Sequence, residues 1–205
     1  MKFIAINKLF RTLLLCLLCT PAAHAEMYQV TVDTSLLAGT AGYVDFQLNP
    51  ADISSPGATA DVANLQGSLT LLATPDVAGD VIGVLPGAIT LTNSTAFNDY
   101  FQSVQFGSSF SFLLDIGGDF LTQASLLGTS FALSLYAADG FSPLLSTDTS
   151  GALVIFELAN QAVTYQTFAD INGAHSAQVS AVPLPAAAWL LLSGLLGMGR
   201  FVRRR

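Results

Sequence analysis

The sequence predicts an all-β protein, a sandwich or jelly-roll-like domain, flanked by an N-terminal signal helix and one C-terminal transmembrane helix. Eight runs of 6–8 residues are rich in Val, Leu, Phe, Thr and Tyr, and several alternate apolar with small polar side chains. Such alternation is typical of half-buried strands. Turn dipeptides, among them Pro56-Gly57, Gly117-Gly118 and Asp139-Gly140, separate the runs. Many short strands between turns favour a sandwich over a parallel sheet.

The expected strands, in chain order, are 27–33, 43–49, 67–74, 88–93, 109–116, 130–137, 152–159 and 162–168. We expect Asp139-Gly140 to turn a hairpin between 130–137 and the run SPLLSTD. The stretch STAFNDYFQSVQ, residues 94–105, repeats apolar side chains at three and four residues. This spacing predicts a short helix, capped by Ser94 or Thr95.

Residues 1–25 have the three parts of a secretory signal peptide. A basic stretch precedes a short apolar run at 13–19, which is too short to span a bilayer. Ala23 and Ala25 then supply the small residues that signal peptidase requires. We therefore expect export through the Sec translocon and cleavage that leaves Glu26 as the new N-terminus.

Both cysteines of the chain, Cys16 and Cys19, lie within this segment. A lipoprotein site at either one is the competing interpretation, but Leu precedes each where a small residue is expected. Cleavage after residue 25 removes both thiols, so the mature chain is expected to have no disulfide and no Cys-ligated metal.

The C-terminus predicts a membrane segment. Residues 186–199 form an uncharged apolar run that Phe201 and Val202 extend past Arg200. As a helix of about 17 residues it would cover about 25 Å, a short span. The basic cluster Arg203-Arg204-Arg205 would remain cytoplasmic and leave the preceding domain outside.

Residues 183–205 resemble the PEP-CTERM sorting signal of Gram-negative bacteria. They combine a Pro-x-Pro element, a following Trp, the run LLLSGLLGMG and a terminal Arg cluster. Leu184 stands where the signal's name places Glu, in a Val-Pro-Leu-Pro form that is similar to a common variant. The residues that carry the resemblance are Pro183, Pro185, Trp189, Ser193, Gly194, Arg203, Arg204 and Arg205.

The resemblance implies recognition by an exosortase, a membrane Cys protease-transpeptidase, with cleavage near the Pro-x-Pro element. It also implies an inner-membrane-anchored intermediate, later delivery to the cell surface or the medium, and association with extracellular polysaccharide. The alternative is a plain membrane anchor.

Residues 28–50, 91–107 and 128–148 resemble, in that order, an ectodomain shared by a group of PEP-CTERM proteins. This resemblance implies a shared β fold and supplies no site residues. The expected organisation is a signal peptide at 1–25, an ectodomain at 26–170, a linker at 171–182 and the sorting signal at 183–205.

Charge is divided sharply along the chain. All fourteen acidic residues lie between 26 and 170, where no Lys or Arg occurs, so the exported domain carries a charge near −14. Nucleic acids and anionic lipids both require cationic surfaces, so neither is an expected partner of this domain.

Two acidic segments are candidates for a Ca²⁺ site because carboxylates are its preferred ligands. Asp76 and Asp80 lie in DVAGD, and Asp115 and Asp119 lie in DIGGD. Neither segment has the spacing of a known calcium loop, and Asp and Gly are ordinary turn residues. No other cofactor is expected.

The residue inventory of the exported domain, residues 26–182, argues against an enzyme. It contains one histidine, His175, and no Cys, Lys, Arg or Gly-x-Ser-x-Gly motif. A single histidine cannot form a zinc site. A carboxylate pair for glycoside hydrolysis could use Glu157, but nothing singles out its partner.

Three functions remain open. The first is a non-enzymatic surface or matrix protein associated with exopolysaccharide. The second is a carbohydrate-binding module, calcium-assisted in one version, and the third is a polysaccharide-acting enzyme. A binding module would stack sugars on exposed tyrosines, and the candidates are Tyr28, Tyr43, Tyr100, Tyr136 and Tyr165.

Overall fold

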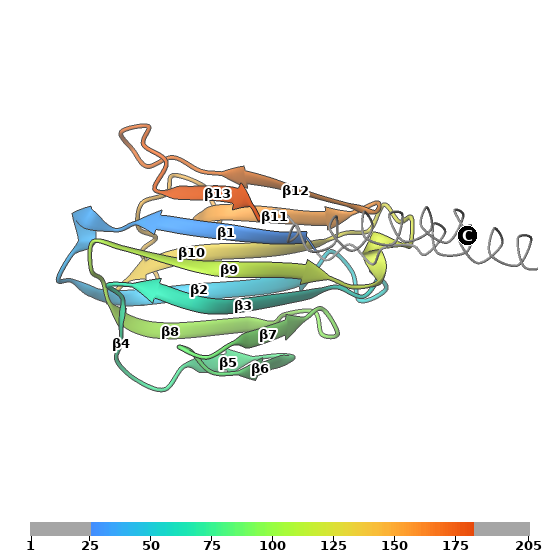
Figure 1. The fold of residues 1–205 in the computed structure, drawn as a ribbon, viewed down its shortest axis with the longest axis horizontal. Helices are drawn as coiled ribbons and strands as arrows, with labels where there is room; N and C mark the ends of the chain where they lie inside the picture. The colour runs from blue at the N-terminus through green and yellow to red at the C-terminus, as the bar shows by residue number, and fades with distance from the viewer. Residues whose placement is uncertain (1–25, 183–205) are drawn as a thin grey trace, which may run out of the picture.

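The computed structural model describes residues 26–182, which form two antiparallel β-sheets packed face to face (Figure 1). The predicted all-β sandwich is confirmed. The signal segment and the sorting signal lie outside the described residues. Within 26–182, no helix is long and apolar enough to cross a membrane.

The first sheet has six strands in the order β13-β1-β9-β3-β7-β6. Its strands are β1 (Glu26–Asp33), β3 (Thr59–Gly67), β6 (Val81–Gly83), β7 (Ile89–Thr92), β9 (Ser109–Gly117) and β13 (Ala177–Ala181).

The second sheet has the order β12-β11-β10-β2-β8-β4, and β5 also pairs with β8. Its strands are β2 (Ala41–Pro50), β4 (Thr70–Leu71), β5 (Asp76–Ala78), β8 (Asp99–Gln105), β10 (Thr129–Ala137), β11 (Ala152–Ala159) and β12 (Ala162–Thr167). Two short 3-10 helices, η1 (Ser35–Leu37) and η2 (Asp119–Leu121), lie in connections between strands.

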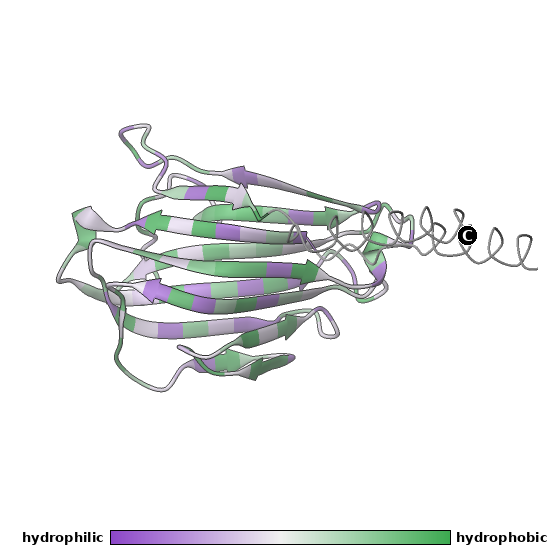
Figure 2. Ribbon diagram, in the orientation of Figure 1, coloured by the Kyte–Doolittle hydropathy of each residue, from purple (hydrophilic) through white to green (hydrophobic). Residues whose placement is uncertain are grey.

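The alternation seen in the sequence builds the core between the sheets. Figure 2 shows hydrophobic and hydrophilic residues alternating along the longer strands. In β9 the side chains of Phe110, Phe112 and Leu114 are buried, while Ser109 is exposed. Phe112 meets Phe46 of β2 edge to face, with ring centroids 5.2 Å apart, so one aromatic pair joins the two sheets.

The predicted helix over 94–105 is wrong, because residues 99–105 form β8. Tyr100, Gln102 and Val104 are buried and alternate with more exposed neighbours, which is the period of a strand. Pairing with β2 runs from Gln47 opposite Asp99 to Ala41 opposite Gln105. Seven residues paired with β2, with the short strands β4 and β5 on the other side, outweigh a weak local helical spacing.

Two other predictions about strands need correction. The predicted strand 67–74 is reduced to the two residues of β4, and β3 at 59–67 was missed. The sequence of β3, TADVANLQG, is poor in β-branched and aromatic residues. Ala60 and Val62 nevertheless face the core, because β3 lies between β7 and β9.

The predicted linker at 171–182 is also wrong, because it contains β13, so the sandwich continues past residue 170. β13 pairs with β1 from Tyr28 opposite Ala181 to Val32 opposite Ala177, and Ala177 is buried. Small residues of β13 pack close to β1. Because this segment has few large side chains, its sequence resembled a linker rather than a strand.

The expected hairpin at Asp139-Gly140 is present as a tight turn. Gly140 has a φ of +75°, a conformation that favours glycine. The backbone N–H of Ala137 donates to the carbonyl of Ser142 at 2.9 Å, and Tyr136 bridges to Pro143. The returning segment forms this single bridge and no strand.

Candidate functional site

A pair of carboxyl groups is buried on the outer face of the seven-stranded sheet. Asp45 lies on β2 between Val44 and Phe46, which face the core, so its own side chain points outward. Asp99 of β8 lies opposite Gln47, which makes Asp45 and Asp99 diagonal neighbours on adjacent strands. Although it points outward, Asp45 is only 2% exposed.

The two carboxyl groups can hydrogen-bond each other when one of them is protonated. Without that proton, the Oδ1 atoms of Asp45 and Asp99 have no hydrogen-bond partner among the described residues. The other oxygen of Asp45, Oδ2, accepts a hydrogen bond from Gln47 Nε2 at 2.8 Å. No Lys or Arg occurs in residues 26–182 to neutralise the pair.

Burial raises the pKa of Asp45 to about 9, and the hydrogen bond and charge of Asp99 add to the effect. Burial also raises the pKa of Asp99, and the negative charge of Asp76 on β5 raises it further. When two carboxyl groups are in contact away from water, ionising both of them is energetically unfavourable. The pair therefore holds one shared proton at neutral pH.

Aromatic rings cover this part of the face. Tyr43 and Phe101 stack with centroids 4.4 Å apart, and Phe101 lies 5.9 Å from Tyr136. A methyl group added to Gly140 would lie within 4 Å of Tyr43 and Phe101, so the 139–140 turn packs over them. Phe101 lies directly opposite Asp45 on the adjacent strand, so this aromatic cluster borders the carboxyl pair.

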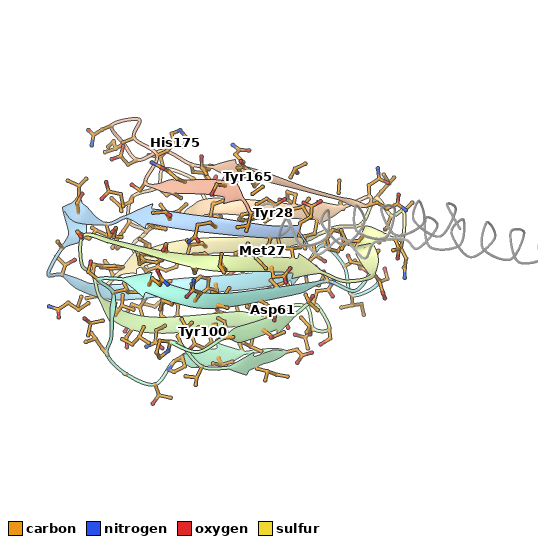
Figure 3. All side chains as sticks on the ribbon, viewed as in Figure 1. Met27, Tyr28, Asp61, Tyr100, Tyr165 and His175 are labelled. Carbon is orange, nitrogen blue, oxygen red and sulfur yellow. The ribbon has the colours of Figure 1, made fainter. Side chains whose placement is uncertain are left out.

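The five tyrosines proposed as sugar platforms have different environments, and Figure 3 labels three of them, Tyr28, Tyr100 and Tyr165. Tyr28 and Tyr100 are buried in the core, and Tyr100 Oη accepts a hydrogen bond from the Leu85 backbone N–H. Tyr43 and Tyr136 belong to the cluster over the carboxyl pair. Tyr165 of β12 is 47% exposed, and its ring packs on Phe156 with centroids 5.5 Å apart.

The four candidate calcium ligands lie in two strands, a turn and a short 3-10 helix. Asp76 lies in β5, and Asp80 follows it in a turn where it accepts hydrogen bonds from Ser94 Oγ at 2.6 Å and from Thr92 Oγ1. These bonds, led by that from Ser94, lower the pKa of Asp80. Its partners are therefore hydroxyl groups of this chain.

The second acidic pair is divided between two elements. Asp115 lies on β9 directly opposite Asp61 of β3, and Asp119 begins η2. Burial, with the nearby charge of Asp61, raises the pKa of Asp115. Across residues 26–182, no group of three or more His, Cys, Asp or Glu is arranged to hold a metal ion.

The two residues considered for catalysis, His175 and Glu157, are both exposed and lie on different elements. His175 Nδ1 lies 2.9 Å from Thr167 Oγ1, in an exposed connection between β12 and β13. Glu157 is exposed on β11, with Ser130 and Thr164 as its cross-strand neighbours. Among these cross-strand neighbours there is no second carboxylate.

A polar hollow of about 360 Å³, which the sequence did not indicate, lies where β1 ends and β9 and β13 begin. Its lining residues are Thr31, Asp33, Ser35, Ser108, Ser109, Ser176 and Gln178. Asp33 is the single charged group, and hydrogen bonds from Ser35 lower its pKa. Three separate chain segments contribute, so no local motif could have marked it.

No protein-family model, curated protein or solved structure matches this chain.

The first and last strands of the described chain, β1 and β13, lie side by side. The backbone N–H of Val182 donates to the carbonyl of Met27 at 2.8 Å, directly beside the Tyr28–Ala181 pair. Glu26 accepts a hydrogen bond from the Tyr28 hydroxyl, whose pKa is raised by burial and by this carboxylate. Of the predicted processing residues, only Glu26 is described. Ala23, Ala25 and the sorting-signal residues lie outside the described range.

Proposed function

We propose that this protein is exported, held in the inner membrane by its C-terminal apolar segment and sorted by an exosortase. It then remains at the cell surface or in the extracellular polysaccharide as a non-enzymatic surface or matrix protein. The observation that carries the proposal is the pairing of β1 with β13.

This pairing matches the two expected processing sites. Glu26, the residue expected after signal cleavage, pairs with Ile116 of β9, and β13 ends at Ala181, two residues before Pro183. Cleavage at both sites would leave every strand of the two sheets in place. The strands described for residues 26–182 thus lie between the two expected processing sites, which is compatible with release by sorting.

The acidic surface suits a solvated extracellular domain, because several of its exposed carboxylates are stabilised by hydrogen bonds and not by cations. Asp139 Oδ1 accepts hydrogen bonds from the backbone N–H groups of Phe141 and Ser142, and Oδ2 accepts one from Ser142 Oγ. These bonds, led by the Ser142 hydroxyl, lower the pKa of Asp139 to about 2. Such a carboxylate stays charged, and keeps the surface hydrated, over the pH range found outside cells.

Intact-mass measurement of the native protein, from the membrane fraction and from the medium, tests the proposal. Residues 26–182 contain no Lys or Arg, so top-down mass spectrometry suits a chain that trypsin cannot cut there. The proposal expects a species that runs from Glu26 to about Pro185, with or without an added group. A mass that runs through Arg205 in every fraction would refute sorting and leave a plain membrane anchor.

Binding of a neutral saccharide is the second candidate function, and the polar hollow favours it. Its hydroxyl, amide and carboxylate groups can donate to and accept from sugar hydroxyls, whereas Asp33 would repel acidic sugars. A glycan array with and without EGTA tests this function on the mature protein. Gln178→Ala should reduce the signal and Gln29→Ala, at the other end of the same strand pair, should not. An array without any bound neutral glycan would exclude it.

A further inference from the structure

Three exposed aliphatic side chains lie together at one end of the sandwich. Ile53, Leu126 and Leu127 are 77%, 98% and 42% exposed. They lie in two loops that are hydrogen-bonded to each other, since Gly128 O accepts from Ala51 N at 2.9 Å and from Ser55 Oγ at 3.0 Å. We call these three side chains the loop patch.

The loop patch lies at the end from which the chain leaves the fold. The loop with Ile53 connects Pro50 of β2 to Thr59 of β3. Thr59 pairs with Gly117, and the preceding residue of β9 pairs with Glu26, at the start of β1. In Figure 1 this is the right-hand end, where β1 starts and towards which β9 and β13 point.

The C-terminal sequence brings this end close to a membrane if the proposed anchoring is correct. The apolar run begins at residue 186, four residues after Val182, whose backbone is hydrogen-bonded to β1. Four extended residues span at most about 14 Å. The folded end is therefore held at the depth of the headgroup layer or directly above it.

The negative charge at this end of the sandwich favours a zwitterionic bilayer over an anionic one. Asp52, next to Ile53, keeps its charge because hydrogen bonds from Ser54 lower its pKa. Glu26 and Asp119 lie at the same end, and residues 26–182 offer no Lys or Arg to attract anionic headgroups. Anionic lipid would repel this surface, whereas a zwitterionic surface would not.

We propose that Ile53, Leu126 and Leu127 insert into the headgroup region of a zwitterionic phospholipid bilayer beside the C-terminal segment. The sandwich is then docked on the membrane until it is processed, rather than joined to it by a tether alone. Exposed aliphatic side chains at interfacial depth bury apolar area there, as amphipathic membrane-surface elements do. This inference rests on the proposed membrane anchoring.

The opposite end of the sandwich provides a matched control. Phe141 is 83% exposed in the turn after β10, whereas Leu126 lies in the loop before β10. The nine residues of β10 separate the two positions by about 30 Å. A side chain at 141 should therefore remain in water whenever one at 126 is in the bilayer.

The experiment uses the signal-cleaved full chain, reconstituted in phosphatidylcholine vesicles. Because this chain has no cysteine, Leu126→Cys and Phe141→Cys each give a single site for an environment-sensitive fluorophore. We expect the probe at 126 to shift to shorter wavelength and to lose roughly half of its emission to doxyl-labelled lipid. The probe at 141 should do neither, and phosphatidylglycerol in the vesicles should reduce the quenching at 126.

The outcomes separate the docking from the proposed function. A chain that resists carbonate extraction but whose probe at 126 remains in water would overturn docking and leave the anchoring intact. A chain that carbonate extracts would overturn both. A blue-shifted probe at 126 without quenching by labelled lipid would overturn docking in favour of contact between copies. Equal quenching in phosphatidylglycerol vesicles would overturn the zwitterionic preference.

Discussion

Replacing Asp45 with asparagine should remove most of the pH dependence of folding stability near neutral pH. Burial raises the pKa of Asp45 to about 9 in the folded protein, from the ordinary value of 3.8 that an unfolded chain retains. Between these values the folded state keeps a proton that the unfolded state has lost. The free energy of unfolding therefore falls as the pH rises through this window.

One retained proton corresponds to about 1.4 kcal/mol per pH unit. From about pH 5 to about pH 7 the wild-type protein should thus lose roughly 3 kcal/mol, a large part of the stability of an ordinary domain. Asparagine has no proton to lose, and its amide can donate to the Oδ1 atom of Asp99 that otherwise has no partner. The Asp45→Asn variant should therefore be nearly flat over this range and more stable than wild type at neutral pH.

Urea unfolding of the mature protein at several pH values, followed by circular dichroism, measures this difference. Asp99 and Asp115 also have raised pKa values and should leave a smaller slope of the same sign in the variant. Asp52→Asn is the control, because Asp52 is exposed, its pKa is lowered, and its contribution is lost only in acid. Parallel pH profiles for wild type and Asp45→Asn would refute the shared proton.

Three further substitutions test the packing and the charge distribution. Phe112→Ala removes a fully buried ring and should lower the free energy of unfolding by about 3–5 kcal/mol, whereas Phe141→Ala, at an exposed side chain, should change it by under about 0.5 kcal/mol. Equal losses in urea unfolding would contradict the assigned core. Asn98→Ala removes a buried amide that donates to two backbone carbonyls and accepts from the Asp80 N–H, and should cost about 2–3 kcal/mol. Asn172→Ala, in an exposed turn, should cost under about 1 kcal/mol, and a reversed order would refute the role of the buried amide. Asp115→Asn removes cross-strand repulsion and should stabilise by roughly 0.5–1 kcal/mol at low salt, so a melting temperature below that of wild type would count against it.

The sequence alone predicted the features that depend on neighbouring residues. Period-two alternation in 109–116 and 130–137 predicted strands, because each residue's face is determined by its place in the run. The Asp139-Gly140 turn was also predictable, because glycine tolerates the positive φ that the turn requires. The export and sorting predictions likewise rest on contiguous runs, and they stay predictions here.

The tertiary structure decided which strands are neighbours, and this corrected the predictions for β8 and β13. Their short or weakly patterned sequences become strands because β2 and β1 provide paired backbones beside them. It also created the Asp45–Asp99 pair, the polar hollow and the loop patch, each from segments far apart in the chain. Alternation specifies which way a side chain points but not what lies across the sheet. Strand pairing in a sandwich is long-range, so the contacts that raise a pKa or gather exposed side chains exist only after the sheets have formed.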